Sequence, residues 1–272
     1  MLLMPDAVNM AESFYQQYHA KSEDDRILFM WRLVLQNMAG GQRYRDVMIK
    51  SVGLAVPAAI LAIPYFYFLL YDFPRQGGPD GVKNAQVLLW GQTAMIFVIC
   101  LLSGFAGSVF TRRLGLPGLG ASKRWKKEAP YLAALGLALM LFIYLAFDRY
   151  FYAVSPGSYP DLSLYMVLLP LKGAFTEELI LRYGLVTIAV GICRNRYGGA
   201  ALVAGFATIL SLEYFEFAGI PLAWNYVCIM QLILAFLANL ILGAVFVTRG
   251  LLAAMTVKLM LEMRYAMAAL LL

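Results

Sequence analysis

The residues of this sequence that could do chemistry are ionisable side chains inside long apolar runs. All of them fall in the second half of the chain: Lys172, Glu177, Glu178, Arg182, Glu213, Glu216, Lys258, Glu262 and Arg264. A charged group in apolar surroundings is costly, so it is rarely kept without a partner or a function. A carboxylate placed there can act as a general base, or it can pair with a cation and fix how helices pack.

Helical spacing sorts these residues into pairs. Glu178 and Arg182 are four residues apart, as are Lys258 and Glu262, so each pair shares one helix face and can form an ion pair. Glu177 lies about 100° further round its helix and must face another element. The spacing therefore predicts a pair along the helix for Glu178 and Arg182, and one carboxylate, Glu177, that points elsewhere. Lys258 and Glu262 can pair with each other or across the bundle.

The composition determines which elements must position these side chains. Of the 272 residues, 62% are hydrophobic and only 14% are charged, whereas soluble domains are about half apolar and about a quarter charged. These values exclude disordered, collagen-like and disulfide-stapled chains and indicate an all-α, polytopic membrane protein in a lipid bilayer. The basic clusters are typical of loops at lipid headgroups, so no nucleic-acid partner is expected. The single histidine, His19, leaves no imidazole for a buried metal site, and no cofactor motif is present.

Seven apolar runs are long enough to cross a bilayer, which takes about 20 residues. They cover residues 50–71, 86–110, 130–154, 162–192, 199–217, 220–247 and 250–271. Because the first three runs are nearly free of interior charge, we expect three parts. These are a cytoplasmic amphipathic segment over 1–46, a three-helix membrane part over 47–158 and a four-helix core over 159–272.

Loop charges predict the orientation. Lys and Arg gather before the first run, in the loop around 111–128 and in later loops on the same side. Cytoplasmic loops carry this excess, so the N-terminus is expected in the cytoplasm and the C-terminus outside the cell membrane.

Other polar and aromatic residues in or near the runs have simpler expected roles. Lys172 is expected to extend to the outer interface, and Asn239 to form an interhelical hydrogen bond. Gly104 and Gly107 favour close helix packing. An interfacial belt on the outer side is expected from Tyr150, Phe151, Tyr152 and Tyr159.

The glutamate pair also carries a family resemblance. The stretch from Pro170 to Arg182, PLKGAFTEELILR, resembles the EExxxR motif of the CAAX prenyl endopeptidase and bacteriocin-processing family (CPBP, or Abi), which comprises glutamate-type intramembrane proteases. The proline seven residues before the double Glu is similar to the family pattern as well. The resemblance covers residues 162–272 and implies a helical membrane core around a polar intramembrane cavity.

Two later family motifs are present only in altered form. The second motif, FxxxH, is matched by Leu210–Tyr214, where Leu replaces Phe and Tyr replaces His. The third places His four residues before Asn, and here Lys258 and Glu262 stand at those positions. Both family histidines are therefore absent.

The resemblance implies that the first Glu and one His activate a water, while the other His and the Asn stabilise an oxyanion. In this chain Glu177 would be the base, and Tyr214 and Lys258 would be the electrophilic groups. The candidate site residues are Glu177, Glu178, Arg182, Tyr214, Lys258 and Glu262.

Three interpretations follow. A lysine that faces the glutamates would hold them as carboxylates, so we favour a non-hydrolytic relative that binds a membrane-protein or lipidated-peptide partner. The alternatives are an active intramembrane endopeptidase that uses Glu177, and a transporter, against which the lack of an internal repeat counts. The packing expected of the four-helix core predicts that Lys258 lies within ion-pair reach of Glu177, Glu178 or Glu262, and an oligomer is left open.

Overall fold

The computed structural model describes residues 41–72, 84–120, 125–154, 159, 164–217 and 226–271. Every regular element in these ranges is a helix, so the described chain is all-α, as predicted. Most of the predicted amphipathic segment, 1–46, lies outside the described residues.

The helices follow the predicted apolar runs, and several contain π-helical segments (η), in which backbone hydrogen bonds join residues five apart. In chain order they are α3 (Gly41–Tyr67), η1 (Phe68–Asp72), α5 (Ala85–Arg113), α6 (Trp125–Ile143), η2 (Tyr144–Asp148), α7 (Arg149–Val154), α8 (Tyr165–Lys172), η4 (Gly173–Glu177), η5 (Leu179–Val186), α9 (Thr187–Cys193), α10 (Arg196–Phe217), α11 (Tyr226–Arg249), α12 (Leu251–Glu262) and α13 (Arg264–Leu271).

Four of the helical stretches are long and apolar enough to cross a membrane. They cover Tyr44–Tyr71, Ala85–Arg113, Lys127–Ala153 and Tyr226–Arg249. They match the first, second, third and sixth predicted runs. Their length and composition are consistent with an all-α integral membrane protein.

The other three predicted runs are helical but do not meet the same criteria, so seven spans stay a prediction. The run from α8 to α9 carries four charged residues, and the apolar stretch of α10 found within the described residues, Arg196–Leu212, is shorter than the four spans. The last run is divided at Met263 between α12 and α13. These three runs contain the ionisable side chains that were selected from the sequence.

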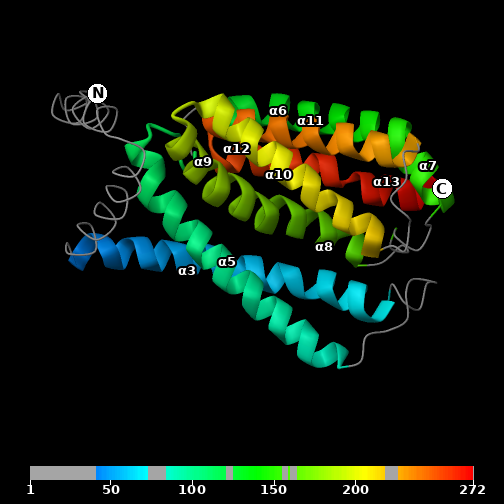
Figure 1. The fold of residues 1–272 in the computed structure, drawn as a ribbon, viewed down its shortest axis with the longest axis horizontal. Coiled ribbons are helices and arrows are strands. Elements are labelled where there is room, and N and C mark those ends of the chain that lie inside the picture. Colours follow the sequence, from blue (N-terminus) through cyan, green and yellow to red (C-terminus); the bar gives the residue numbers. More distant parts are fainter. Residues whose placement is uncertain are drawn as a thin grey trace.

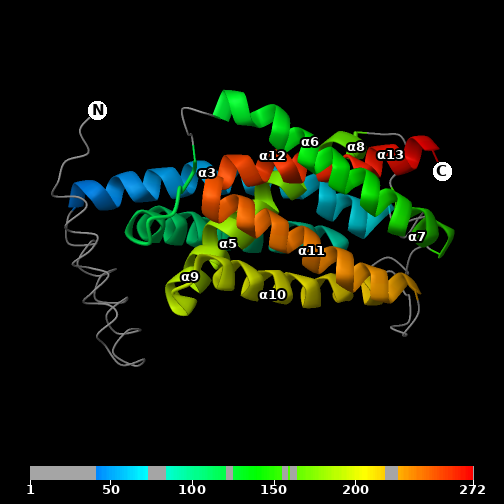
Figure 2. The ribbon, with the colours of Figure 1, turned by 90° about the horizontal axis from the view of Figure 1, so that it is seen from above.

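Helices α3 and α5 pack against each other on one side of the molecule, and the remaining helices form a bundle beside them (Figure 1). The view from above places α11 between α10 and α12 (Figure 2), and α6 packs along α12. The segment η5 contacts both α5 and the bundle. The helix that carries the glutamate pair is therefore central to the fold.

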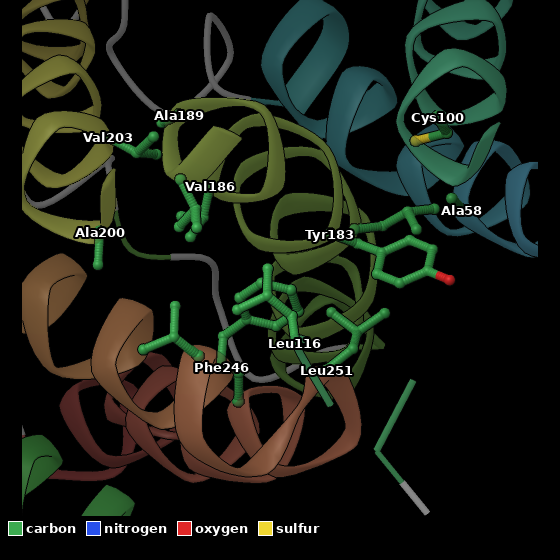
Figure 3. Close-up of a cluster of buried hydrophobic side chains, with 14 of the residues drawn as sticks. Ala58, Cys100, Leu116, Tyr183, Val186, Ala189, Ala200, Val203, Phe246 and Leu251 are labelled. Carbon is green, nitrogen blue, oxygen red and sulfur yellow. The ribbon is translucent and has the colours of Figure 1, made fainter. Parts of the chain in front are cut away.

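A core of small and aliphatic side chains surrounds this central helix. Figure 3 shows Val186 and Tyr183 of η5 among side chains from α3, α5, α10, α11 and α12. Leu179 and Val186 are fully buried there, as is Phe246 of α11. Such close packing fixes the rotation of the central helix about its axis, and with it the directions of Glu177 and Glu178.

A loop contact sets the start of α12. The backbone N–H groups of Leu251 and Leu252 donate to the carbonyl oxygens of Gly118 and Leu119, over N···O distances of 2.9 and 3.2 Å. Gly250 has φ +96°, and a Cβ on it would lie 2.6 Å from the Cα of Gly120. The loop thus satisfies donors at the start of the helix that carries Lys258.

Candidate site: ion pairs on the central helix

Glu177, at the end of η4, lies between two lysines. Its Oε1 accepts a hydrogen bond from Nζ of Lys172 at 2.8 Å, and its Oε2 lies 3.1 Å from Nζ of Lys258. The two lysine side chains are largely buried, whereas 35% of the Glu177 side chain is exposed. Both carboxylate oxygens of this candidate base are therefore already in contact with a cation.

Lys258 joins Glu177 to a second carboxylate. Its Nζ also pairs with Oε1 of Glu262, one turn further along α12. Lys258 thus lies within reach of two of the three acids named from the sequence, and that prediction is confirmed. Together Lys172, Glu177, Lys258 and Glu262 form a chain of alternating charge, which we call the open network because Glu177 is partly exposed.

The expected role of Lys172 was wrong. Instead of extending to the outer interface, its Nζ binds Glu177 and lies 3.9 Å from the centroid of the Tyr65 ring on α3. On a regular α-helix, residues five apart point in directions about 140° apart. The π-helical turn η4 lies between these two residues, and its i→i+5 bonding brings them together.

Glu178 lies in a different environment. It is 0% exposed and pairs with Arg182, which is 1% exposed, over 3.4 Å from Oε2 to Nε. Nη2 of Arg182 donates to Oδ1 of Asn239 on α11 at 2.8 Å. The predicted pair along the helix and the predicted interhelical bond of Asn239 are both confirmed.

This buried group, Glu178, Arg182 and Asn239, is incompletely bonded. Both oxygens of Glu178, and Nε and Nη1 of Arg182, are buried without a hydrogen-bond partner among the described residues. We call Glu178 and Arg182 the closed pair. It is held by charge attraction in surroundings of low polarity rather than by a full set of hydrogen bonds.

Close contacts with α5 and α3 position the central helix. A Cβ on Gly107 would lie 2.3 Å from the Tyr183 ring, and one on Gly184 would lie 2.6 Å from Oγ of Ser103. Oγ1 of Thr176 donates to the carbonyl oxygen of Ala58 at 3.0 Å. The predicted close packing at Gly107 is confirmed, and Gly104 likewise lies against Ser51.

A third buried ion pair involves a residue that the sequence analysis did not select. Oδ1 of Asp148 accepts a hydrogen bond from Nη1 of Arg264 at 2.9 Å and another from the Tyr159 hydroxyl at 2.7 Å. Burial and the Asp148 carboxylate raise the pKa of the Tyr159 phenol, which stays protonated and donates. Asp148 is separated from Arg264 by 116 residues, so no local spacing could predict the pair.

The prediction of an interfacial aromatic belt is wrong for two of its four residues. Phe151 and Tyr159 are buried and pack against each other beside Asp148, while Tyr150 is exposed. Tyr150 contacts Tyr226, whose hydroxyl donates to the carbonyl oxygen of Ala146.

The charges of the three groups balance. Four bases and four acids contribute, and every one of them is paired: Lys172, Arg182, Lys258 and Arg264 with Glu177, Glu178, Glu262 and Asp148. Paired charges cost far less in apolar surroundings than isolated ones. The three groups are therefore neutral as a set.

For three residues selected from the sequence, the side chains lie outside the described part of the structure: Glu213, Tyr214 and Glu216. Within the part of the chain that is described, no group of three or more His, Cys, Asp and Glu side chains could hold a metal ion.

Of the six candidate site residues, Glu177, Lys258 and Glu262 lie together in the open network, and Glu178 and Arg182 form the closed pair. No family model, curated protein or solved structure matches this chain.

Proposed function

We propose that this protein is a non-hydrolytic relative of the CAAX prenyl endopeptidase and bacteriocin-processing family, and that it binds a transmembrane or lipidated partner within the cell membrane. The proposed topology has seven spans, with the N-terminus in the cytoplasm and the C-terminus outside. The partly exposed Glu177 of the central helix then faces a partner instead of a scissile peptide bond.

One observation carries the proposal: both oxygens of Glu177 are in contact with lysines. A general base must take up a proton from water, and two ammonium groups in contact with the carboxylate stabilise its charged form and oppose that proton transfer. Glu178 cannot replace it, because it is completely buried and paired with Arg182. The arrangement favours binding over hydrolysis.

The residues at the family's histidine positions support the same conclusion. Neutral imidazole can share a water proton, whereas a lysine in contact with two carboxylates stays charged. Lys258 is in that position, between Glu177 and Glu262.

The test uses a photo-crosslinking amino acid at Leu171, an exposed residue next to Lys172 on α8. We expect it to crosslink one membrane protein or lipidated peptide in native membranes. The same probe at Trp90, an exposed residue of α5, should not crosslink that partner. The double variant Lys172→Met, Glu177→Leu removes one acid and one base together, so it keeps the charge balance and should still weaken crosslinking from Leu171.

Two further variants separate binding from hydrolysis. Glu177→Gln keeps the shape of the side chain but removes the base, and Glu128→Gln is a matched control in the separate Glu128–Arg249 ion pair. We expect the cleaved membrane peptides in cells to be the same with the wild type and both variants. Uncleaved substrate that accumulates only with Glu177→Gln would contradict the proposal and establish an endopeptidase.

A further inference from the structure

The open network has acceptor capacity that its lysines do not use. A carboxylate offers about four lone-pair positions, and Lys172 and Lys258 occupy one on each oxygen of Glu177. With 35% of its side chain exposed, Glu177 can accept further hydrogen bonds from outside the described chain. The group that meets it must be a donor.

That donor should carry no charge. Lys172 and Lys258 already balance Glu177 and Glu262, and the closed pair balances itself. Glu177 lies 12 residues after the start of α8, about 18 Å along the helix, so in the proposed topology it is far from either membrane surface. At that depth an added lysine or glutamate would leave one charge unpaired.

The neighbouring surface of α8 indicates the kind of molecule that brings the donor. Leu164, Val167 and Leu171 are exposed large apolar residues that recur every three or four positions, so they share one face of the helix. This face ends beside Lys172, the partner of Glu177. An apolar helix face with an adjacent buried acceptor is complementary to a transmembrane helix with one polar residue near its middle.

We infer that the exposed oxygens of Glu177 accept a hydrogen bond from an uncharged side-chain donor, an amide or a hydroxyl, on a transmembrane helix that packs along Leu164, Val167 and Leu171. This inference rests on the proposed function, because it assigns the chemistry of the partner at the same site. It specifies a neutral polar residue of the partner near mid-membrane.

The experiment uses polyleucine transmembrane peptides with a single guest residue at the midpoint: Asn, Leu, Lys or Glu. Binding to the full-length protein in phosphatidylcholine vesicles is measured by energy transfer, at a peptide density where the peptides alone do not associate. We expect the Asn peptide to bind about threefold to fifteenfold more tightly than the Leu peptide, as for other interhelical hydrogen bonds in membranes. The Lys and Glu peptides should bind more weakly than the Asn peptide.

Variants tie this preference to Glu177. The double variant Lys172→Met, Glu177→Leu stays neutral but loses the acceptor, so it should bind the Asn and Leu peptides equally. Glu177→Gln keeps an acceptor oxygen but leaves the network with one extra positive charge, so the Glu peptide should gain affinity. Glu128→Gln should behave as the wild type.

Each contrary result overturns a distinct statement. Equal binding of Asn and Leu peptides to the wild type, or tighter binding of the Lys or Glu peptide, would overturn the inference of a neutral donor. An Asn preference that survives in the double variant would place the acceptor elsewhere. Absence of a crosslinked partner at Leu171 in native membranes would instead overturn the proposed function.

Discussion

Glu177 and Glu178 are neighbours in the chain, but they differ in exposure to solvent and in the cations that contact them. Glu177 is partly exposed and has a lysine on each oxygen, one from its own helix and one from α12. Glu178 is fully buried and pairs with Arg182 on the same helix at 3.4 Å. One step of the helix therefore separates a carboxylate that joins two elements from one enclosed in the core.

Both glutamates are paired with cations, so charge pairing alone does not define a functional site. Four buried polar atoms of the closed pair have no hydrogen bond within the part of the chain that is described, so the pair is energetically demanding and depends on the packing around it. The open network has shorter contacts, and part of it remains accessible. Loss of the first should affect folding, and loss of the second should mainly affect binding.

The largest effect is expected from a variant that breaks the closed pair. Arg182→Met leaves Glu178 as an unpaired buried charge and should lower the free energy of unfolding by about 3–5 kcal/mol. Thermal unfolding in mild detergent measures it. The double variant Glu178→Leu, Arg182→Met should recover most of the loss, and no recovery would show that the two side chains are not energetically coupled.

The next effect tests the packing that positions both glutamates. Gly107→Ala places a methyl group against the Tyr183 ring, so the central helix must shift, at a cost of about 1–3 kcal/mol. Gly91→Ala is the matched control, because Gly91 lies on α5 like Gly107 but a Cβ there would have no heavy atom within 4 Å. If both variants unfold at the same temperature, the contact between α5 and η5 does not hold the central helix in place.

A smaller effect is expected in the open network. Lys172→Met leaves Glu177 paired with Lys258 and partly exposed, so the free energy of unfolding should fall by about 1.5–2 kcal/mol, at the lower end of the range for one hydrogen bond to a charged group. Unfolding under the conditions used for Arg182→Met compares the two directly. A loss as large as that of Arg182→Met would remove the contrast between the two groups.

The smallest effect is expected at an exposed pair. Glu128 and Arg249 join α6 to the end of α11, and about half of the Arg249 side chain is exposed. Glu128→Gln should change the free energy of unfolding by about 0.5 kcal/mol or less, and less still at high salt. A shift above 2 °C in the unfolding temperature at high salt would show that exposure is a poor guide to the energy of these pairs.

Local spacing predicted much of the helix architecture and part of the site. The four-residue spacing of Glu178 and Arg182, and of Lys258 and Glu262, allows each pair to form along a helix, and both pairs form. The expected core packing put Lys258 within reach of Glu177, Glu178 or Glu262, and it contacts Glu177 and Glu262. The long apolar runs located the helices, and four of the described ones are long enough to span a membrane. These features depend on short-range geometry, which a sequence contains directly.

The missed contacts depend on geometry that the sequence does not display. Lys172 reaches Glu177 because a π-helical turn lies between them, and α-helical spacing puts them on different faces. Asp148 meets Arg264 only through the tertiary fold. The same pair explains why Tyr159 is buried instead of lying in an interfacial belt.

The neutral pairing of charges also constrains how the protein enters the bilayer during synthesis. In the proposed topology, the α8–α9 helix emerges with Glu177 and Lys172 well before Lys258 and Glu262 of α12 are made. Charged segments insert poorly by themselves, so each depends on helices already present in the membrane. We expect α12 to insert late, once the central helix is in position to pair with it. Truncated chains that end before Leu251 should therefore be retained by insertion factors longer than the full chain.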